Sequence, residues 1–185
     1  MSLGPTLTTE RLILRPPIHA DFDGFAEMAS EEDTMRFIGG VTPRDGAWRM
    51  MATLTGAWAL LGYSMFSVLR RDTGEWIGRL GPWRPGGKEG GWPGDEVGWG
   101  LKASAAGQGF AAEGATAAID WAFDQLGWEN VIHCIDKENA PSIALAKRLG
   151  SSVQREDVAL APPFEMHKVD IYGQSKADWK ARRAR

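Results

Sequence analysis

The sequence predicts a single α+β domain over residues 1–185, with helices flanking a mixed, mostly antiparallel sheet. A chain of 185 residues has the length of one domain, and 43% hydrophobic with 24% charged residues is an ordinary globular balance. In the first half, two strand patterns joined by an Asp-Thr-Gly turn predict an antiparallel hairpin. In the second half, strand and helix patterns alternate, which predicts strand–helix–strand units.

The first half contains one long amphipathic helix among shorter elements. From Ala47 to Leu61, apolar residues recur at spacings of four, three, four and three, which is one helical stripe. Pro43 is expected in the first turn of this helix, and Gly62 is expected to end it. The expected elements are a strand over 12–15, helices over 21–29, 31–38 and 42–61, and strands over 63–69 and 75–83.

The second half follows a loop rich in Gly and Pro. Gly127 and Gly150 are expected to end two helices, and Ser175-x-x-Asp178 has the pattern of a capping box. The expected elements are a strand over 96–101, a helix over 108–126, a strand over 130–135, a helix over 139–149, strands over 153–160 and 165–172, and a short C-terminal helix.

Composition excludes several classes of protein. A net charge of −3 gives no electrostatic footprint for nucleic acid, and the basic segment 176–185 is expected to be a solvated end. One cysteine, Cys134, excludes an internal disulfide, and the three histidines lack metal-ligand spacing. The uncharged stretch 50–69 is diluted by Gly, Ser and Thr, so we expect no membrane span. We therefore expect a cytoplasmic protein without a metal, nucleic-acid or membrane partner.

The segment from Glu96 to Gly114 carries the chemistry. A strand pattern runs into a loop with Gly107 and Gly109, and the loop opens a helix. Glycine lets a ligand approach the backbone closely, and the first helical turn offers free N–H groups at the positive end of the helix dipole. Such a loop can hold a phosphate group without a basic side chain.

A dinucleotide is one candidate ligand. Gly107-x-Gly109-x-x-Ala112 matches the fingerprint Gly-x-Gly-x-x-Gly/Ala, and Asp136 could serve as the ribose acid. That fingerprint needs a tight turn directly after the strand, whereas five residues separate Leu101 from Gly107. The chain behind the motif is also too short for a doubly wound sheet.

Coenzyme A is the other candidate, because several motifs resemble those of the GNAT superfamily of acyl-CoA-dependent N-acyltransferases. The segment Ala106-Gly-Gln-Gly-Phe-Ala111 is similar to the superfamily's loop Gln/Arg-x-x-Gly-x-Gly/Ala, with Ala106 as a departure at the first position. Asn139-x-x-Ser142 resembles the start of the family's next helix. The segments 9–15, 96–101 and 172–179 are similar to the RimJ/RimL-like branch, so the resemblance covers about residues 8–180.

The resemblance implies a GNAT-like sheet splayed open between its central strands, with acetyl-CoA as co-substrate in the gap. Backbone groups of the first strand would pair with the pantetheine arm, the loop amides would hold the pyrophosphate, and Asn139 would contact the arm from the other wall. The cofactor-binding residues that it implies are Trp99, Leu101, Ala106, Gly107, Gln108, Gly109, Phe110, Ala111, Asn139 and Ser142.

Two residues are the catalytic candidates. The resemblance implies that Ser142 stands at the position that can protonate the departing thiolate. Many members use a Tyr a little further along this helix, but this chain has no Tyr between Tyr63 and Tyr172, so Ser142 or a water must serve. Glu96 could take the proton of the amine directly or through water. Asn139 and Ser142 could instead cap a helix, His133 is more often a satisfied core residue, and Cys134 is more often a small buried one.

The resemblance implies direct transfer of an acetyl group from acetyl-CoA to a primary amine within a ternary complex. The acceptor stays open among a protein N-terminus, an amino acid, a polyamine and an aminoglycoside, and Trp48, Trp83 and Trp92 are expected to line its pocket. A non-catalytic acyl-CoA-binding module and a dinucleotide-binding oxidoreductase are the alternative functions. Monomer and homodimer both stay open.

Overall fold

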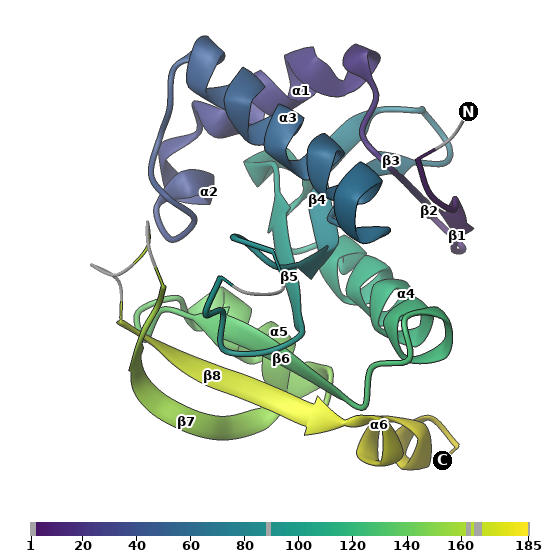
Figure 1. Ribbon diagram of the computed structural model, residues 1–185. Coiled ribbons are helices and arrows are strands. Elements are labelled where there is room, and N and C mark those ends of the chain that lie inside the picture. Colours follow the sequence, from purple (N-terminus) through teal and green to yellow (C-terminus); the bar gives the residue numbers. More distant parts are fainter. Residues whose placement is uncertain (1–2, 88–89, 162–163, 165–167, 185) are drawn as a thin grey trace. The chain divides into compact units, whose positions relative to one another are not determined.

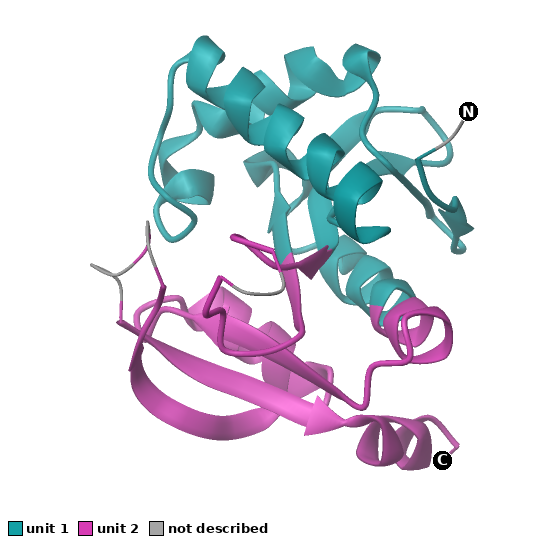
Figure 2. Ribbon diagram, viewed as in Figure 1, with its two compact units in different colours: residues 1–81, 99–118 teal, residues 82–98, 119–185 magenta. Residues whose placement is uncertain are grey.

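The computed structural model describes residues 3–87, 90–161, 164 and 168–184, and Figure 1 shows its helices and strands. The chain forms two compact units (Figure 2). Unit 1 consists of residues 1–81 and 99–118, and unit 2 consists of residues 82–98 and 119–185. The unit boundaries fall inside β4 (Trp76–Trp83), β5 (Glu96–Leu101) and α4 (Phe110–Gln125).

Unit 1 holds the N-terminal strands, the helices α1 to α3 and the start of α4. The β3–β4 pair is antiparallel, with Phe66 opposite Leu80, so the predicted hairpin is confirmed. The sequence did not predict β1, which is only two residues long, and α2 is shorter than expected. The elements are β1 (Leu7–Thr8), β2 (Leu12–Arg15), η1 (His19–Asp21), α1 (Phe22–Ala29), α2 (Glu32–Met35), α3 (Arg44–Leu61), β3 (Phe66–Arg70), β4, the end of β5, η2 (Ala103–Ala105) and the start of α4.

The long helix α3 buries the stripe that the sequence predicts. Trp58 is 1% exposed, and its Nε1 donates a hydrogen bond to the carbonyl of Met65. Gly62 ends the helix with φ of 77°, a conformation that favours glycine. Pro43 is the N-cap and not a first-turn residue, because its ψ of 166° is extended and the helix begins only at Arg44.

Unit 2 is built around one parallel and two antiparallel strand pairs. β6 and β8 pair along the whole of β6, and β7 pairs antiparallel with β8, as predicted. The expected start of the last strand, residues 165–167, lies outside the described residues, and β8 continues to Ser175. The elements are the end of β4, the start of β5, the end of α4, β6 (Asn130–Ile135), α5 (Ala140–Arg148), β7 (Ser152–Ala159), β8 (Lys168–Ser175) and α6 (Lys176–Arg183).

The strands follow the order β1-β2-β3-β4-β5-β6-β8-β7. β5 and β6 are parallel, and among the described residues their register contains the single pair Glu96 and Ile132. Their pairing therefore stops near the beginning of β5, which is the predicted splay. The observed fold is α+β with a mostly antiparallel sheet, and it excludes the doubly wound sheet of a dinucleotide-binding oxidoreductase.

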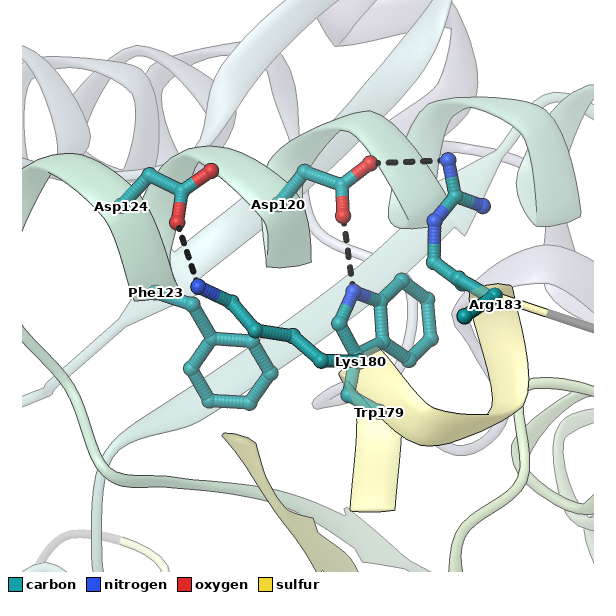
Figure 3. A pocket seen from close by; sticks show the side chains of 7 residues that line it. Asp120, Phe123, Asp124, Trp179, Lys180 and Arg183 are labelled. Atoms are coloured by element: carbon teal, nitrogen blue, oxygen red, sulfur yellow. Dashed lines mark hydrogen bonds and ion pairs between the residues drawn. The ribbon is translucent and has the colours of Figure 1, made fainter. Parts of the chain in front are cut away.

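The basic C-terminal segment forms the helix α6, and apart from Trp179 its residues from Ala177 to Arg183 are exposed, as expected of a solvated end. A cavity of about 250 Å³ lies between α6 and the end of α4, and Figure 3 shows the side chains that line it. Trp179 is buried there and donates to Asp120, which also pairs with Arg183, while Lys180 lies 3.5 Å from Asp124. These contacts attach α6 to α4.

Ser175 caps α6, as predicted, by accepting a hydrogen bond from the amide of Asp178. None of the helices in the described part of the chain is both long and apolar enough to cross a membrane.

Candidate active site

The glycine loop before α4, in unit 1, leaves backbone amides open. Gly107 and Gly109 have φ of 71° and 81°, which L side chains rarely adopt. The first amide with a helical acceptor is that of Glu113, which donates to the carbonyl of Gly109. The amides before it lie in the first turn, where helix geometry provides no acceptor. No side chain accepts from the amides of residues 107–111 within the described residues.

Arg11 on the N-terminal side of β2 fixes this loop. Its Nη1 donates to the carbonyl of Gln108 at 2.9 Å, and its Nε donates to Glu113 at 2.6 Å. Its guanidinium lies 4.6 Å from the centre of the Phe110 ring. Thr9 Oγ1 also donates to Glu113, and burial, which raises the pKa of this carboxyl, is outweighed by the hydrogen bonds from Thr9 and Arg11 that lower it.

These contacts answer whether the loop fits a pyrophosphate. A Cβ on Gly107 would meet nothing within 4 Å, so the space in front of the loop is open. The carbonyl of Gln108, which would repel an anion, accepts a hydrogen bond from Arg11. The departure at Ala106 removes a side chain and leaves the amides intact. Gln108, Phe110 and Ala111 lie with these residues at the start of α4, so the loop part of the predicted set is brought together.

The splay of β5 and β6, in unit 2, is closed by two side chains. Ile132 donates to the carbonyl of Asp95, and the next rung of a regular parallel ladder would join the amide of Cys134 to the carbonyl of Val97. That rung is broken. Glu96 Oε1 accepts from the Cys134 amide at 3.0 Å, and His133 Nδ1 lies 2.7 Å from the Val97 carbonyl. Each strand thus satisfies the group that the other strand leaves without a partner.

Glu96 is a buried carboxyl with one bond to each oxygen. Its Oε2 accepts from Trp92 Nε1 at 2.7 Å, and the residue is 5% exposed. Burial raises the pKa of Glu96 to about 7, against the hydrogen bonds from Cys134 and Trp92, which lower it. A carboxyl with a pKa near 7 can gain or lose a proton at neutral pH.

His133 cannot share that role. Because a carbonyl only accepts, His133 Nδ1 carries the proton, and Nε2 then accepts from the hydroxyl of Ser151 at 3.1 Å. Burial lowers the pKa of His133 to about 4, against its bond with Val97, which raises it. Gln174 donates to Ser151 and completes the chain. His133 is therefore a satisfied core residue, as predicted.

Cys134, predicted to be a small buried residue and not a nucleophile, is half-buried. The cause is that β6 alternates at the splay, so that His133 turns inward and Cys134 does not. Burial of the sulfur and the nearby Glu96 charge raise the pKa of the Cys134 thiol, which argues against a nucleophile.

Asn139 and Ser142 meet at the start of α5. Asn139 is the N-cap, and its Oδ1 accepts from the Ser142 amide at 3.2 Å. The helix-capping interpretation of Asn139 is therefore confirmed, and its role toward a cofactor stays a prediction. Ser142 is half-buried in the first turn, where its hydroxyl role also stays a prediction.

The predicted site residues divide between the units. Trp99, Leu101 and the loop 106–111 belong to unit 1, whereas Glu96, Asn139 and Ser142 belong to unit 2. Of the three tryptophans predicted to line the acceptor pocket, Trp48 falls in unit 1, and Trp83 and Trp92 fall in unit 2. Sequence reasoning missed Trp92 as the partner of Glu96 and Arg11 as the residue that holds the loop. Arg11 does stand in the segment 9–15 that carries one of the motifs, which was its signal.

Within the residues that the structure describes, no three His, Cys, Asp or Glu side chains gather in a way that could hold a metal ion.

Known proteins identify the class. The family model for the acetyltransferase (GNAT) domain matches residues 11–152. A Bacillus licheniformis protein named uncharacterized N-acetyltransferase p20 is 31% identical over 173 residues, which is 90% of this chain and 93% of that protein. The crystal structure of an acetyltransferase from Agrobacterium tumefaciens superposes with a TM-score of 0.79 at 29% identity, covering 93% of this chain and 95% of that one.

The chain therefore belongs to the GNAT acetyltransferase family, whose members use acetyl-CoA as the acetyl donor. A RimL ribosomal L7/L12 α-N-protein acetyltransferase in complex with coenzyme A has the same fold, with a TM-score of 0.73 at 15% identity. That likeness covers 92% of this chain and 98% of that one.

Proposed function

We propose that the protein transfers an acetyl group from acetyl-CoA to a primary amine, with Glu96 as the general base. The observation that carries the proposal is the buried carboxyl at the splay, whose pKa is raised by burial to about 7. An amine is protonated at neutral pH and must lose a proton before it attacks a thioester. A base with a pKa near the working pH serves that purpose best.

The transfer is direct. The amine nitrogen attacks the thioester carbonyl carbon, a C–N bond forms, and the C–S bond then breaks. Before the attack, one proton of the ammonium group goes to Glu96, directly or through water, and the tetrahedral intermediate then loses a second proton from nitrogen to solvent. The departing thiolate takes a proton from solvent or from Ser142, whose hydroxyl proton solvent restores. The products are an acetamide and coenzyme A. A backbone N–H near the splay would hold the oxyanion that forms in between.

The proposed cofactor site uses the open amides of the α4 loop. Residues 107–111 would hold the pyrophosphate, and the backbone of Trp99 and Leu101 would pair with the pantetheine arm. Asn139 and Ser142 would contact the arm from α5. Coenzyme A at 100 times its dissociation constant should then stabilise the fold by about 2.7 kcal/mol, whereas NAD should not.

An acceptor screen tests the proposed function. A panel of primary amines is incubated with acetyl-CoA, free thiol is followed over time, and acetamide is identified by mass spectrometry. The proposal expects thiol release that depends on both the amine and Glu96. A protein that binds coenzyme A but releases no thiol with any amine would instead be a non-catalytic acyl-CoA-binding module.

We also propose that the chain belongs to the RimJ/RimL-like branch. Its support is the similarity of the segments 9–15 and 96–101 to that branch, together with the fold shared with RimL. Arg11 gives the first of these segments a physical role, because it holds the loop that would bind the pyrophosphate. The proposal thus includes a protein N-terminus in the amine panel.

A further inference from the structure

Arg79 is a buried cation that has no carboxylate partner among the residues that the structure describes. It lies on β4 in unit 1 and is 8% exposed. Its Nη1 points at the sulfur of Met65 at 2.7 Å and its Nη2 at that of Met50 at 3.9 Å. Its Nε has no hydrogen-bond partner within the described residues. Thioether sulfur is a weak acceptor, so a guanidinium with five donors is poorly satisfied here.

A second arginine in unit 1 shows what a partnered charge looks like. Arg15 forks onto Asp21 with two bonds of 2.7 Å. Asp21 also accepts from Ser67, which lies opposite Arg79 across β3 and β4. The carboxylate on this face is thus fully used by other groups, and Arg79 faces sulfur and the Phe25 ring instead.

The position of Arg79 on β4 connects it to the reaction. It follows Gly78, where a Cβ would collide with the carbonyl of Gly100 and the Cα of Leu101. These residues form the end of β5, whose backbone is proposed to pair with the pantetheine arm. Arg79 is therefore next to the strand segment that would carry the acetyl donor.

We propose that Arg79 binds the carboxylate of an acceptor that carries both an amine and a carboxylate, as an amino acid does. This proposal rests on the proposed function. A carboxylate matches the fork of a guanidinium, which can donate two parallel hydrogen bonds to it. Met50 and Met65 cover the guanidinium, and their unbranched side chains can turn aside without movement of the backbone. Polyamines and aminoglycosides lack the group that this site requires.

Matched acceptors test the proposal through kcat/KM for thiol release. Each amino acid is compared with its carboxamide, which keeps the amine and removes the charge. The wild type should prefer the acid by at least about 100-fold, as expected where a buried polar site loses its partner. In Arg79→Met this preference should fall to within about threefold, with no loss of melting temperature, because a buried unpaired charge is removed. The control Arg49→Met removes an exposed cation on α3 and should keep the preference.

A second readout needs no turnover. The Nε–H resonance of Arg79, assigned by its loss in Arg79→Lys, should shift on titration of the wild type with an amino acid and stay in place with the carboxamide. Equal kcat/KM for acid and amide, or a resonance that ignores both, would overturn the proposal and leave the proposed function standing. If no amine releases thiol, the proposed function is overturned. The titration of the Arg79 resonance then tests by itself whether Arg79 binds a carboxylate.

Discussion

Two regions of the molecule leave backbone groups without their regular partners, and they treat these groups in opposite ways. At the splay in unit 2, the amide of Cys134 and the carbonyl of Val97 are both taken by side chains. At the start of α4 in unit 1, no described side chain accepts from the loop amides, and Arg11 holds a neighbouring carbonyl instead. The first region is closed and the second is open.

This difference between the splay and the α4 loop suits the two regions to different tasks, proton transfer and ligand binding. Closing the broken rung draws two titratable side chains into the interior, where burial raises the pKa of Glu96 to about 7 and lowers that of His133 to about 4. Only Glu96 then changes charge near neutral pH. A backbone amide without an acceptor can donate a hydrogen bond to a ligand, whereas an amide that already donates to a side chain cannot. We therefore assign the proton transfer to the splay and the pyrophosphate to the loop.

Removing the base should have the largest effect. In Glu96→Gln, kcat at pH 7 should fall by about 10²–10⁴-fold, the usual contribution of general base catalysis. The amide oxygen of Gln can still accept from Cys134, so the dissociation constant for coenzyme A should stay the same. Glu156→Gln, which changes an exposed carboxyl on β7, is the control and should leave kcat unchanged. A kcat within threefold of wild type in Glu96→Gln would remove Glu96 from the mechanism.

A substitution in the open loop before α4 should have the second-largest effect. In Gly109→Asp, a carboxylate would enter the loop that is proposed to hold the pyrophosphate, with its Cβ 3.4 Å from Arg11 Nη2, and calorimetry should show coenzyme A binding at least about 100-fold weaker. Backbone strain is a competing cause, because Gly109 has φ of 81°. Gly109→Asn also places a side chain at this positive φ but adds no charge, and Asn tolerates the conformation better than most residues. Its affinity for coenzyme A should therefore lie between those of the wild type and Gly109→Asp. Unchanged affinity in both variants would place the phosphate site elsewhere.

The two buried groups at the splay should also oppose each other in the pH dependence of stability. Glu96 has a raised pKa, so the stability linked to it is present below pH 4.5 and is lost as pH rises through 7. His133 has a lowered pKa, so the stability linked to it is present above pH 6.5 and is lost as pH falls through 4. Between these limits the two slopes nearly cancel in the wild type.

Glu96→Gln removes one of the two slopes. Relative to the wild type, the free energy of unfolding of this variant should rise with pH between about 4.5 and 6.5, by up to about 1.4 kcal/mol per pH unit. Urea unfolding over that range measures the difference. Parallel curves for the two proteins would show that Glu96 is not buried in its charged form.

Loosening the loop should have a moderate effect. Arg11→Ala loses the bonds to Gln108 and Glu113, and we expect coenzyme A to bind about tenfold more weakly, the equivalent of about 1.4 kcal/mol. Arg70→Ala is a matched control, because Arg70 also lies over the Phe110 ring but bonds to Asp72 and not to the loop. Equal weakening in both variants would mean that the ring contact matters and the loop bonds do not.

The smallest effect is expected at α5. Ser142→Ala should lower kcat only at the bottom of the general-acid range, about 10²-fold, and less if water replaces the hydroxyl. A helix-start serine without a catalytic role would instead cost about 1 kcal/mol of stability with kcat nearly intact. Measuring kcat and the melting temperature on the same variant separates the two roles.

The sequence predicts most of this fold because its signals are local. The bounds of β5 and β6 follow from short apolar runs, and Gly62 marks the end of α3. The two-residue strand β1 has no such pattern, since it exists only by pairing with β2. The packing of α6 likewise depends on Asp120 and Asp124, which are remote in sequence from Lys176–Arg183.

The candidate site shows the same contrast between local sequence patterns and long-range packing. The glycine loop and the cap at Asn139 are local patterns, so the sequence could indicate them. The roles of Glu96 and His133 depend on a rung that breaks between two strands, and Arg79 is defined by the acceptors that it lacks. Such features appear only when distant segments pack together.

The pH profile of kcat/KM tests the central claim most directly, using the best amine of the panel with acetyl-CoA held saturating. In the wild type, log kcat/KM should rise with pH and level off with a pKa near 7, at the same place for amines of different basicity. In Glu96→Gln this limb should disappear, because the group that titrates is gone. A limb that moves with the pKa of the amine and persists unchanged in Glu96→Gln would contradict the assignment of Glu96 as the base.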